Sequence, residues 1–204
     1  MLKAVKRYYK CWDEVVIDEL TQEDEDLLEE ALRETKDALI LDVGCGYGRI
    51  MKIIKKWGYY VIGIDVSEEL LKRARGISDV IVGSLTHLPF RDKVFDVCLC
   101  IYGPLNHIPS LTNGIMEIAR VCRWRIVSSF YNTFSTYFLY KPQKVFAALF
   151  LRHRVRILKT YHAKQLIKKF NECGLKVRLW RGQLLGRFKL HTHAKLIAII
   201  ADIQ

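Results

Sequence analysis

The chain has 204 residues, half of them hydrophobic, and carries a formal net charge of +11 at pH 7. This length and composition predict a single folded domain over residues 1–204, and no run of about 18 apolar residues is present that would predict a membrane span. The six cysteines form no C-x-x-C pair, so buried free thiols in a reduced cytoplasm are the simplest prediction.

The first 36 residues are expected to form a helical cap. Apolar residues recur at helical spacing over residues 3–20, and Tyr9 lies within this segment. Thr21 is a candidate N-cap because acidic residues follow it at once, so a second helix is expected from there to about Thr35.

A buried parallel strand is predicted over Ala38–Val43, because this run is apolar and rich in branched residues. It leads into the glycine-rich turn Gly44–Gly48 and then into a helix whose apolar positions run from Ile50 to Trp57. Glycines let the backbone turn tightly and approach a ligand, and the first N–H groups of the helix then face that ligand.

A second buried strand, Tyr59–Asp65, ends in an acid. Ser67 is expected to cap a helix over Glu68–Ala74, which has acids in its first turn. A third, short strand is predicted over Val80–Ser84.

A fourth strand is predicted over Val94–Ile101, with Tyr102–Pro104 as the loop that follows it. A helix over roughly Leu111–Val121 and a fifth strand over Trp124–Phe130 come next. Strands that alternate with helices at this spacing predict an α/β fold with a parallel sheet.

Residues 131–160 interrupt this alternation with an aromatic-rich insertion. Core packing of an inserted helix pair is the favoured interpretation, and a lid or wall over a substrate pocket is the alternative. Within it, Arg154–Thr160 is a candidate extra strand.

The last quarter of the chain is expected to hold a helix over Ala163–Cys173, which Gly174 ends. Two final strands are predicted over Leu175–Trp180 and His193–Ala201. These strands are expected to form an antiparallel end of the sheet.

Two features together indicate a cofactor that contains adenosine. The glycine spacing is G-x-G-x-G, over Gly44, Gly46 and Gly48. Arg49 follows where a nicotinamide-binding fingerprint carries a small residue, which disfavours an NAD-dependent oxidoreductase. Asp65, at the end of the second strand, is suited to accept hydrogen bonds from two vicinal ribose hydroxyls.

The chain resembles the class I S-adenosylmethionine-dependent methyltransferases, most clearly from Leu39 to Phe130. Four motifs occur in the family's order: Leu41–Gly48, Ile64–Ser67, Val82–Leu85 with Leu88–Phe90, and Phe95–Cys98 with Leu105–Ile108. The resemblance implies a Rossmann-like, doubly wound sheet of seven mostly parallel strands, with an antiparallel edge and helices on both faces. It also implies S-adenosyl-L-methionine as the cofactor and S-adenosyl-L-homocysteine as the product.

The same resemblance implies which residues hold the cofactor. The glycine turn would lie against the methionine moiety, and Asp42 would help to position its amino group. Asp65 would bind the ribose hydroxyls, and Val66 would pack on the adenine. The other cofactor-binding residues that it implies are Gly44, Cys45, Gly46, Gly48, Ser84, Leu85, Ile101 and the N-terminal Tyr9.

Two departures from the family's pattern stand out. Ser84 occupies the place where the third motif usually carries Asp. Its hydroxyl would still accept a hydrogen bond from the adenine amino group but without a charge, so a lower cofactor affinity is expected. The Lys-Pro-Gly-Gly turn that usually precedes the fifth strand is also missing, because Val121–Arg125 runs straight into that strand.

Methyl transfer from a sulfonium needs little acid–base chemistry, so catalysis is expected to come from alignment in a dry pocket. If a base is required, His107 is the candidate, with Asn106 and Tyr102 as hydrogen-bonding neighbours. A packing or capping role for His107 is the alternative. His191 and His193 share a strand face without a third ligand, so no metal site is predicted.

The methyl acceptor is left open between two classes. The aromatic segment favours a small molecule held in an apolar pocket, and this is the preferred prediction. The last quarter favours RNA, because residues 152–204 hold 13 Lys and Arg against 2 Asp and Glu. A non-catalytic cofactor- or RNA-binding protein with the same fold is the second functional hypothesis.

Overall fold

The computed structural model describes residues 22–133, 159–183 and 196–204. The predicted helix over residues 3–20, which contains Tyr9, and most of the aromatic segment lie outside these ranges. Within the described ranges, no helix combines the length and the apolar composition that crossing a bilayer requires.

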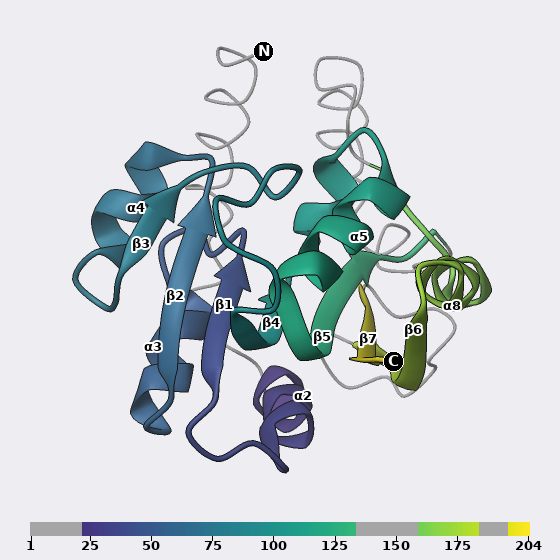
Figure 1. Ribbon diagram of the computed structural model, residues 1–204, viewed down its shortest axis with the longest axis horizontal. Helices are drawn as coiled ribbons and strands as arrows, with labels where there is room; N and C mark the ends of the chain where they lie inside the picture. The colour runs from purple at the N-terminus through teal and green to yellow at the C-terminus, as the bar shows by residue number, and fades with distance from the viewer. Residues whose placement is uncertain (1–21, 134–158, 184–195) are drawn as a thin grey trace, which may run out of the picture.

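The described residues form one seven-stranded sheet, which runs from β3 at one edge to β6 at the other (Figure 1). Its strands are β1 (Leu39–Val43), β2 (Tyr60–Asp65), β3 (Val80–Val82), β4 (Phe95–Cys100), β5 (Cys122–Tyr131), β6 (Leu175–Gln183) and β7 (Leu196–Ile203). Their order is β3-β2-β1-β4-β5-β7-β6. Strands β1 to β5 pair in parallel, and β7 is antiparallel to both β5 and β6. The predicted fold class, with its antiparallel edge, is confirmed.

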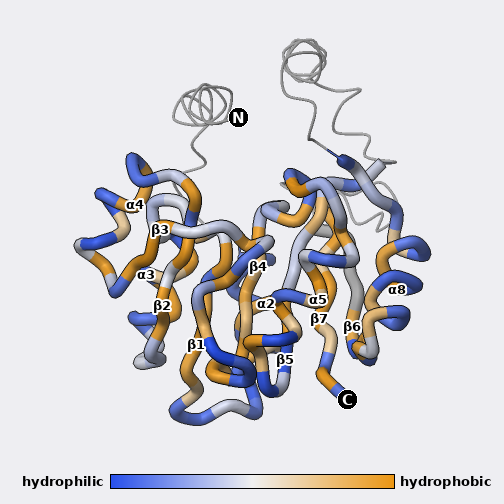
Figure 2. Tube along the Cα trace, turned by 45° about the horizontal axis from the view of Figure 1, so that its top comes forward, coloured by the Kyte–Doolittle hydropathy of each residue, from blue (hydrophilic) through white to orange (hydrophobic). Residues whose placement is uncertain are grey.

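Helices cover both faces of this sheet. They are α2 (Gln22–Leu32), α3 (Arg49–Lys56), α4 (Glu68–Ala74), α5 (Leu111–Val121) and α8 (Ala163–Glu172), together with the short 3-10 helix η1 (Pro104–His107). Helices α2, α3 and α4 pack into one hydrophobic cluster, and α5 and α8 pack into a second. Figure 2 shows apolar strands between helices whose outer turns are hydrophilic.

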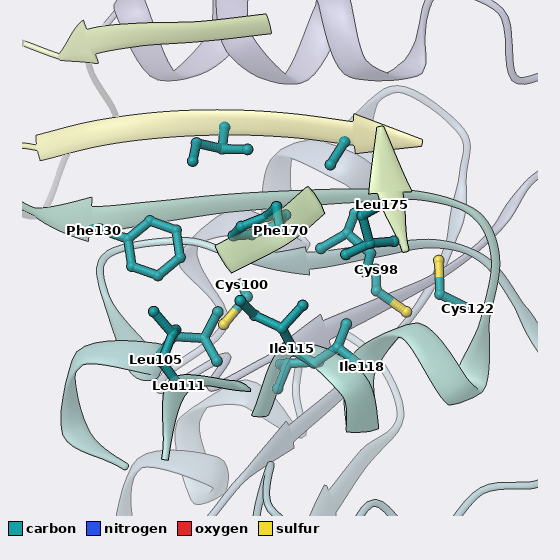
Figure 3. Packing of buried hydrophobic residues seen from close by; sticks show 14 of the residues in the cluster. Cys98, Cys100, Leu105, Leu111, Ile115, Ile118, Cys122, Phe130, Phe170 and Leu175 are labelled. Carbon is teal, nitrogen blue, oxygen red and sulfur yellow. The ribbon is translucent and has the colours of Figure 1, made fainter. Parts of the chain in front are cut away.

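Burial on both faces explains why the strands are almost continuously apolar. In β1, Ile40 belongs to the cluster under α2, α3 and α4, and its neighbour Leu41 belongs to the cluster under α5 and α8. Cys98 and Cys100 of β4 both point into the second cluster, which Phe130 and other apolar side chains fill (Figure 3). The predicted burial of these two thiols on one strand face is therefore confirmed.

The strand order also places a topological switch point, where a ligand crevice is expected, at the carboxyl ends of β1 and β4. The chain leaves β1 for α3 on one face and leaves β4 for α5 on the other, although the two strands are neighbours. In an open α/β sheet, ligands bind at such a switch point. The glycine turn after β1 and the η1 segment after β4 meet there.

Most predicted boundaries hold to within two residues. Helices α4 and α5 have the predicted bounds, and Ser67 caps α4 by accepting a hydrogen bond from the Leu70 N–H at 3.3 Å. Strand β5 begins at Cys122, directly after α5, so the predicted absence of a turn is confirmed.

Some predicted boundaries were wrong. Helix α2 ends at Leu32, three residues before the expected end, and β6 extends to Gln183, three residues beyond the expected end. Strand β3 ends at Val82, because Ser84 turns back to form an isolated bridge with His87. The loop after β4 continues into η1, a helical turn that the sequence pattern did not indicate. The predicted strand over residues 154–160 lies mostly outside the described residues and stays a prediction, although residues 159 and 160 are described and neither is in a strand.

The buried side chain of Arg125 links α2 to the sheet. Arg125 of β5 is 1% exposed, and its Nε donates to Asp202 of β7 at 2.6 Å. Its other nitrogens donate to the Ala31 carbonyl at 2.8 Å and to Glu34 at 3.3 Å, both at the end of α2. The guanidinium also stacks on Trp124, at 3.8 Å from the ring centre. Because every donor group of this side chain has a partner, the charge is tolerated inside the fold.

Candidate cofactor site

The glycine turn between β1 and α3 has a conformation that requires glycine. Gly44, Gly46 and Gly48 have φ angles of +75°, +55° and +88°, in the left-handed region. A Cβ atom added at Gly44 would lie 2.5 Å from Pro104 Cγ, so the turn also packs tightly against the start of η1. Gly48 is the N-cap of α3 and provides no side-chain cap to its first N–H groups. The N–H groups of Gly44, Cys45, Gly46 and Gly48 donate to oxygens of the protein, so the turn is a tightly held cradle in front of the N-terminus of α3.

Asp65 holds this cradle in place. Its Oδ2 accepts a hydrogen bond from the Gly46 N–H at 2.9 Å, and its Oδ1 accepts one from the Ser67 N–H at 2.8 Å. The carboxyl is 5% exposed, and this burial raises its pKa, while the N–H groups of Ser67, Gly46 and Val66 act in the opposite direction. The side chain thus links the glycine turn to the start of α4, a bracing role that the sequence did not predict.

Asp42 lies at the carboxyl end of β1 with an unsatisfied oxygen. The residue is 2% exposed, and its Oδ2 has no hydrogen-bond partner among the described residues. Burial, and then the neighbouring Asp65, raise the pKa of this carboxyl to about 7, while Arg49 acts to lower it. A buried acceptor without a donor needs an explanation, and a ligand that carries a cationic donor provides one.

Other predicted cofactor residues lie around the same edge. Val66, which follows β2, is 46% exposed and presents an apolar surface to solvent. Ser84 follows β3, and its Oγ is 2.8 Å from Thr86 Oγ1. Leu85 is half-buried against the cluster of α5 and α8. An exposed apolar side chain between two strand ends suits a planar ring such as adenine.

Two further predicted residues lie deeper in the fold. Cys45 is 8% exposed, and burial raises the pKa of its thiol well above its usual range, so it forms a neutral part of the turn. Ile101 is 4% exposed and packs in the cluster of α2, α3 and α4. Tyr9 lies outside the described residues.

Tyr102, at the end of β4, is held by contacts to three other elements. Its backbone has φ +67°, which is uncommon for a residue other than glycine. Its N–H donates to Ser129 Oγ of β5 at 2.6 Å, and its hydroxyl donates to Asp24 of α2. The Arg49 guanidinium lies over its ring at 3.9 Å from the centre. Burial raises the pKa of the phenol, so it stays protonated and acts as a donor.

Asn106 is fully buried in η1 and uses its side-chain amide for structure. Its Nδ2 donates to the Lys159 carbonyl, and its Oδ1 accepts from the Tyr131 N–H at 3.3 Å. These bonds join η1 to the end of β5 and to the segment before α8. Asn106 is therefore a positioning residue for the wall of the crevice.

His107, at the end of η1, is a neutral imidazole. Burial lowers its pKa to about 4, so it carries no charge at pH 7. Its ring stands edge-on to the ring of Tyr131, with 6.4 Å between the centres. A neutral ring nitrogen at this position accepts or donates a hydrogen bond but is a weak base.

The structure adds Asp24, Ser129 and Arg49 to the predicted site. The sequence marked Asp24 only as one of several acids at the start of a helix, and Arg49 only as a departure from a nicotinamide fingerprint. No spacing pattern in the sequence connects these three residues, because they come from α2, β5 and α3. Only the packing of these elements around Tyr102 brings them together.

Comparisons with known proteins agree on the type of domain. Residues 41–124 match a family model described as a methyltransferase domain. An uncharacterised protein of Methanocaldococcus jannaschii is 34% identical over 133 residues, which are 60% of this chain and 57% of that protein. The demethylmenaquinone methyltransferase of Tropheryma whipplei is 28% identical over 173 residues, which are 74% of this chain and 72% of that enzyme.

A solved structure shows the same fold at low sequence identity. The magnesium protoporphyrin IX methyltransferase of Synechocystis, with S-adenosylmethionine bound, has a TM-score of 0.64 and 16% identity. The similarity covers 89% of this chain and 77% of that one. The chain spans little more than half the length of the Methanocaldococcus relative.

Proposed function

We propose that the chain is a class I methyltransferase, which binds S-adenosylmethionine and transfers the methyl group to an acceptor. The match of residues 41–124 to a methyltransferase domain and the shared fold support this proposal. The observation that carries the proposal is the buried Asp42 carboxyl, whose Oδ2 has no hydrogen-bond partner among the described residues and which ends β1 directly before the glycine turn. That arrangement suits the ammonium group and the neighbouring atoms of an amino-acid ligand.

The residues that would hold the cofactor lie along the carboxyl ends of β1, β2 and β3. Asp42 accepts a hydrogen bond from its ammonium group, and Asp65, whose oxygens each have a second acceptor site, binds the ribose hydroxyls. Val66 packs on the adenine ring, and Ser84 accepts from the adenine amino group. When bound, this cofactor supplies a methyl group that its sulfonium has already activated.

The residues after β4 prepare the acceptor side of the crevice. Asn106 and Tyr102 fix the course of the chain through their hydrogen bonds, and His107 presents a neutral nitrogen. Where the acceptor releases a proton, His107 accepts a hydrogen bond from it and orients its lone pair. Alignment and exclusion of water then contribute more than proton transfer.

A small organic molecule is the favoured acceptor class. The edge-on rings of His107 and Tyr131 form an aromatic wall at the end of η1, which suits an apolar or planar acceptor. The similarity to a demethylmenaquinone methyltransferase also supports this class.

RNA is the alternative acceptor, supported by exposed lysines on α8 and β6, which include Lys164, Lys168 and Lys176. A cytoplasmic location is part of the same proposal, supported by the free thiols of the described cysteines.

Titration calorimetry with S-adenosylmethionine and S-adenosylhomocysteine tests the cofactor. Binding of both is expected, and binding of neither would contradict the proposal. Incubation of a cell extract with the protein and methyl-labelled cofactor, followed by separation into RNA, protein and small-molecule fractions, tests the acceptor. Label in the small-molecule fraction is the expected result, and label in RNA would establish the alternative.

If the cofactor binds and no fraction is labelled, the non-catalytic hypothesis is favoured. The matched control for that experiment is Asp42→Asn, which keeps the size of the side chain and removes its charge. Labelling that persists unchanged in this variant would show that Asp42 is not part of the site.

A further inference from the structure

One side of α5 lies against the segment that joins β3 to β4. The helix directs its apolar side into the hydrophobic cluster (Figure 3). Beside that apolar side, Gly114, Glu117 and Arg120 follow one another at intervals of three residues, which places them in a row along the helix. Each of the three contacts a different part of residues 85–92.

Gly114 lets Leu85 approach the helix closely. A Cβ atom added at Gly114 would lie 3.2 Å from Leu85 Cδ1, which is tighter than an ordinary contact. It would also lie 2.8 Å from Leu105 Cδ2 of η1. Leu85 is one of the residues assigned to the adenine side of the proposed site. The missing side chain at position 114 therefore sets the depth at which Leu85 packs.

Glu117 binds the backbone of the same segment. Its Oε1 accepts a hydrogen bond from the Leu88 N–H at 2.8 Å. The carboxylate also accepts from Nη2 and Nε of Arg120, at 2.8 Å and 3.0 Å. These bonds from Arg120 lower the pKa of Glu117, so its carboxylate stays ionised. The side chain is thus held in one orientation by its neighbour on the next turn of the helix.

Arg120 binds the segment at three further points. Its Nη2 donates to the Leu88 carbonyl at 3.0 Å, and its Nη1 donates to the Phe90 carbonyl at 2.9 Å. The same Nη1 donates to the Asp92 carboxylate at 2.6 Å. A planar guanidinium provides this set of directions at once, which a lysine ammonium does not.

The attachment at Leu88 reaches Ser84 through a short turn. The His87 N–H donates to the Ser84 carbonyl at 3.0 Å. Ser84 Oγ lies 2.8 Å from Thr86 Oγ1 and accepts from the Thr86 N–H at 3.3 Å. Because Leu88 follows this turn directly, a shift of its backbone would move the Ser84 hydroxyl, which is assigned to the adenine amino group.

We propose that Gly114, Glu117 and Arg120 position the base-binding end of the cofactor site, because they hold Ser84 and Leu85 in place from α5. They are positioning residues, since each acts through the segment and none is assigned a contact with the cofactor. The inference rests on the proposed function, because it presumes that the adenine of S-adenosylmethionine lies against this segment.

Calorimetry with two ligands separates this role from general support of the fold. The ligands are S-adenosylhomocysteine and S-ribosylhomocysteine, which keeps the homocysteine and the ribose but has a hydroxyl group in place of the base. The unsubstituted protein is expected to bind S-adenosylhomocysteine more tightly. Arg120→Met should weaken that binding roughly 3- to 10-fold, the effect of one misplaced neutral hydrogen bond, and leave S-ribosylhomocysteine nearly unaffected.

Three further variants complete the test. Arg120→Lys keeps the charge with fewer donors and should lose less affinity for S-adenosylhomocysteine. Arg120→Met should have a smaller further effect in a Ser84→Ala protein, because the hydroxyl that it positions is gone. Arg178→Met is the matched control: it removes a similar pair of bonds to Glu34, at the opposite edge of the sheet from β3, and should change neither affinity.

The outcomes are distinct. Equal weakening of both ligands by Arg120→Met would mean that Arg120 only supports the fold, and an unchanged affinity for S-adenosylhomocysteine would mean that the segment keeps its place without it. Either result overturns the inference, as does an undiminished effect of Arg120→Met in the Ser84→Ala protein.

The unsubstituted protein provides two more checks. Equal affinity for the two ligands would overturn the inference, because the base would then not be recognised. If neither ligand binds, the proposed function itself fails. Thermal unfolding of each variant identifies a loss that is due to misfolding, in which case Arg120→Lys decides.

Discussion

Asp42 combines burial, a missing hydrogen bond and a carboxyl neighbour, and this combination implies a pH dependence. Its pKa is about 7 in the folded protein, above the ordinary value of 3.8. The folded state therefore holds a proton that the unfolded chain has lost, so the contribution of Asp42 to stability declines from about pH 4 to pH 7. Above pH 7 the full cost of the buried charge is present.

Cofactor binding should have the opposite pH dependence. A cationic ligand requires the ionised carboxylate, so the affinity for S-adenosylmethionine is expected to increase roughly tenfold between pH 6 and pH 8. Calorimetry at several pH values, in buffers with different ionisation enthalpies, measures both the affinity and the proton released.

Asp42→Asn is the matched control for this pH series. It should bind more weakly and lose the proton release. Four other groups around Asp42 matter for this interpretation. They are the Asp65 carboxyl, the Arg49 guanidinium and the thiols of Cys45 and Cys100, which stay protonated because burial raises their pKa. If the affinity of Asp42→Asn still depends on pH, the titrating group is Asp65 and not Asp42.

For individual residues, the sequence predicted which residues belong to the site better than it predicted what each of them contacts. Asp42, Asp65 and the three glycines were recognisable because strand, turn and helix follow one another along the chain. The hydrogen bonds of Asn106 to Tyr131 and Lys159, by contrast, join residues far apart in the sequence. No local pattern indicates the direction in which such a side chain points.

Among the elements, the glycine turn is constrained both by its own backbone and by what packs against it. At Gly44, alanine would have a strained φ and a Cβ 2.5 Å from Pro104. At Gly58, after α3, alanine would have the same kind of strain with no atom within 4 Å.

Gly44→Ala should therefore cost more than Gly58→Ala, whose cost is limited to about 1–2 kcal/mol of backbone strain. It should also weaken cofactor binding, since η1 must move away. Urea unfolding and calorimetry of the two variants measure these effects. Equal losses of stability and an unchanged affinity in Gly44→Ala would show that the turn adapts.

The attachment of α2 provides a second prediction for elements. Asp202→Asn removes a carboxylate charge from the buried Arg125 and should lower the free energy of unfolding by about 3 kcal/mol. Glu34→Gln should have a much smaller effect, because the Glu34 carboxylate is half-exposed and water can accept the hydrogen bonds that it loses. Thermal and urea unfolding compare the two variants, and similar losses would contradict the central role of Asp202.

For the whole molecule, ligand binding at the switch point should stabilise the fold. The glycine turn, the Asp65 side chain that braces it and the helices around the site come together only in the native state. The cofactor is therefore expected to bind the folded protein alone. At a concentration 100 times its dissociation constant, S-adenosylhomocysteine should add about 2.7 kcal/mol and raise the melting temperature by about 5–10 °C.

Scanning fluorimetry with increasing S-adenosylhomocysteine measures this shift. Adenosine, which lacks the amino-acid end, serves as the comparison and should give a smaller shift at equal concentration. An unchanged melting temperature at saturating S-adenosylhomocysteine would count against the site.

The sequence by itself determined the fold class, the succession of five parallel strands along the chain and the site of the glycine turn. These properties follow from local patterns: apolar runs, helix caps and glycines whose spacing reflects backbone geometry. The tertiary structure alone decided that Asp65 braces the turn, that Oδ2 of Asp42 has no hydrogen-bond partner in the described part of the chain, and that Arg49 stacks on Tyr102. Such contacts join separate strands and helices, and their energies depend on burial and distance, which arise only when the sheet is assembled.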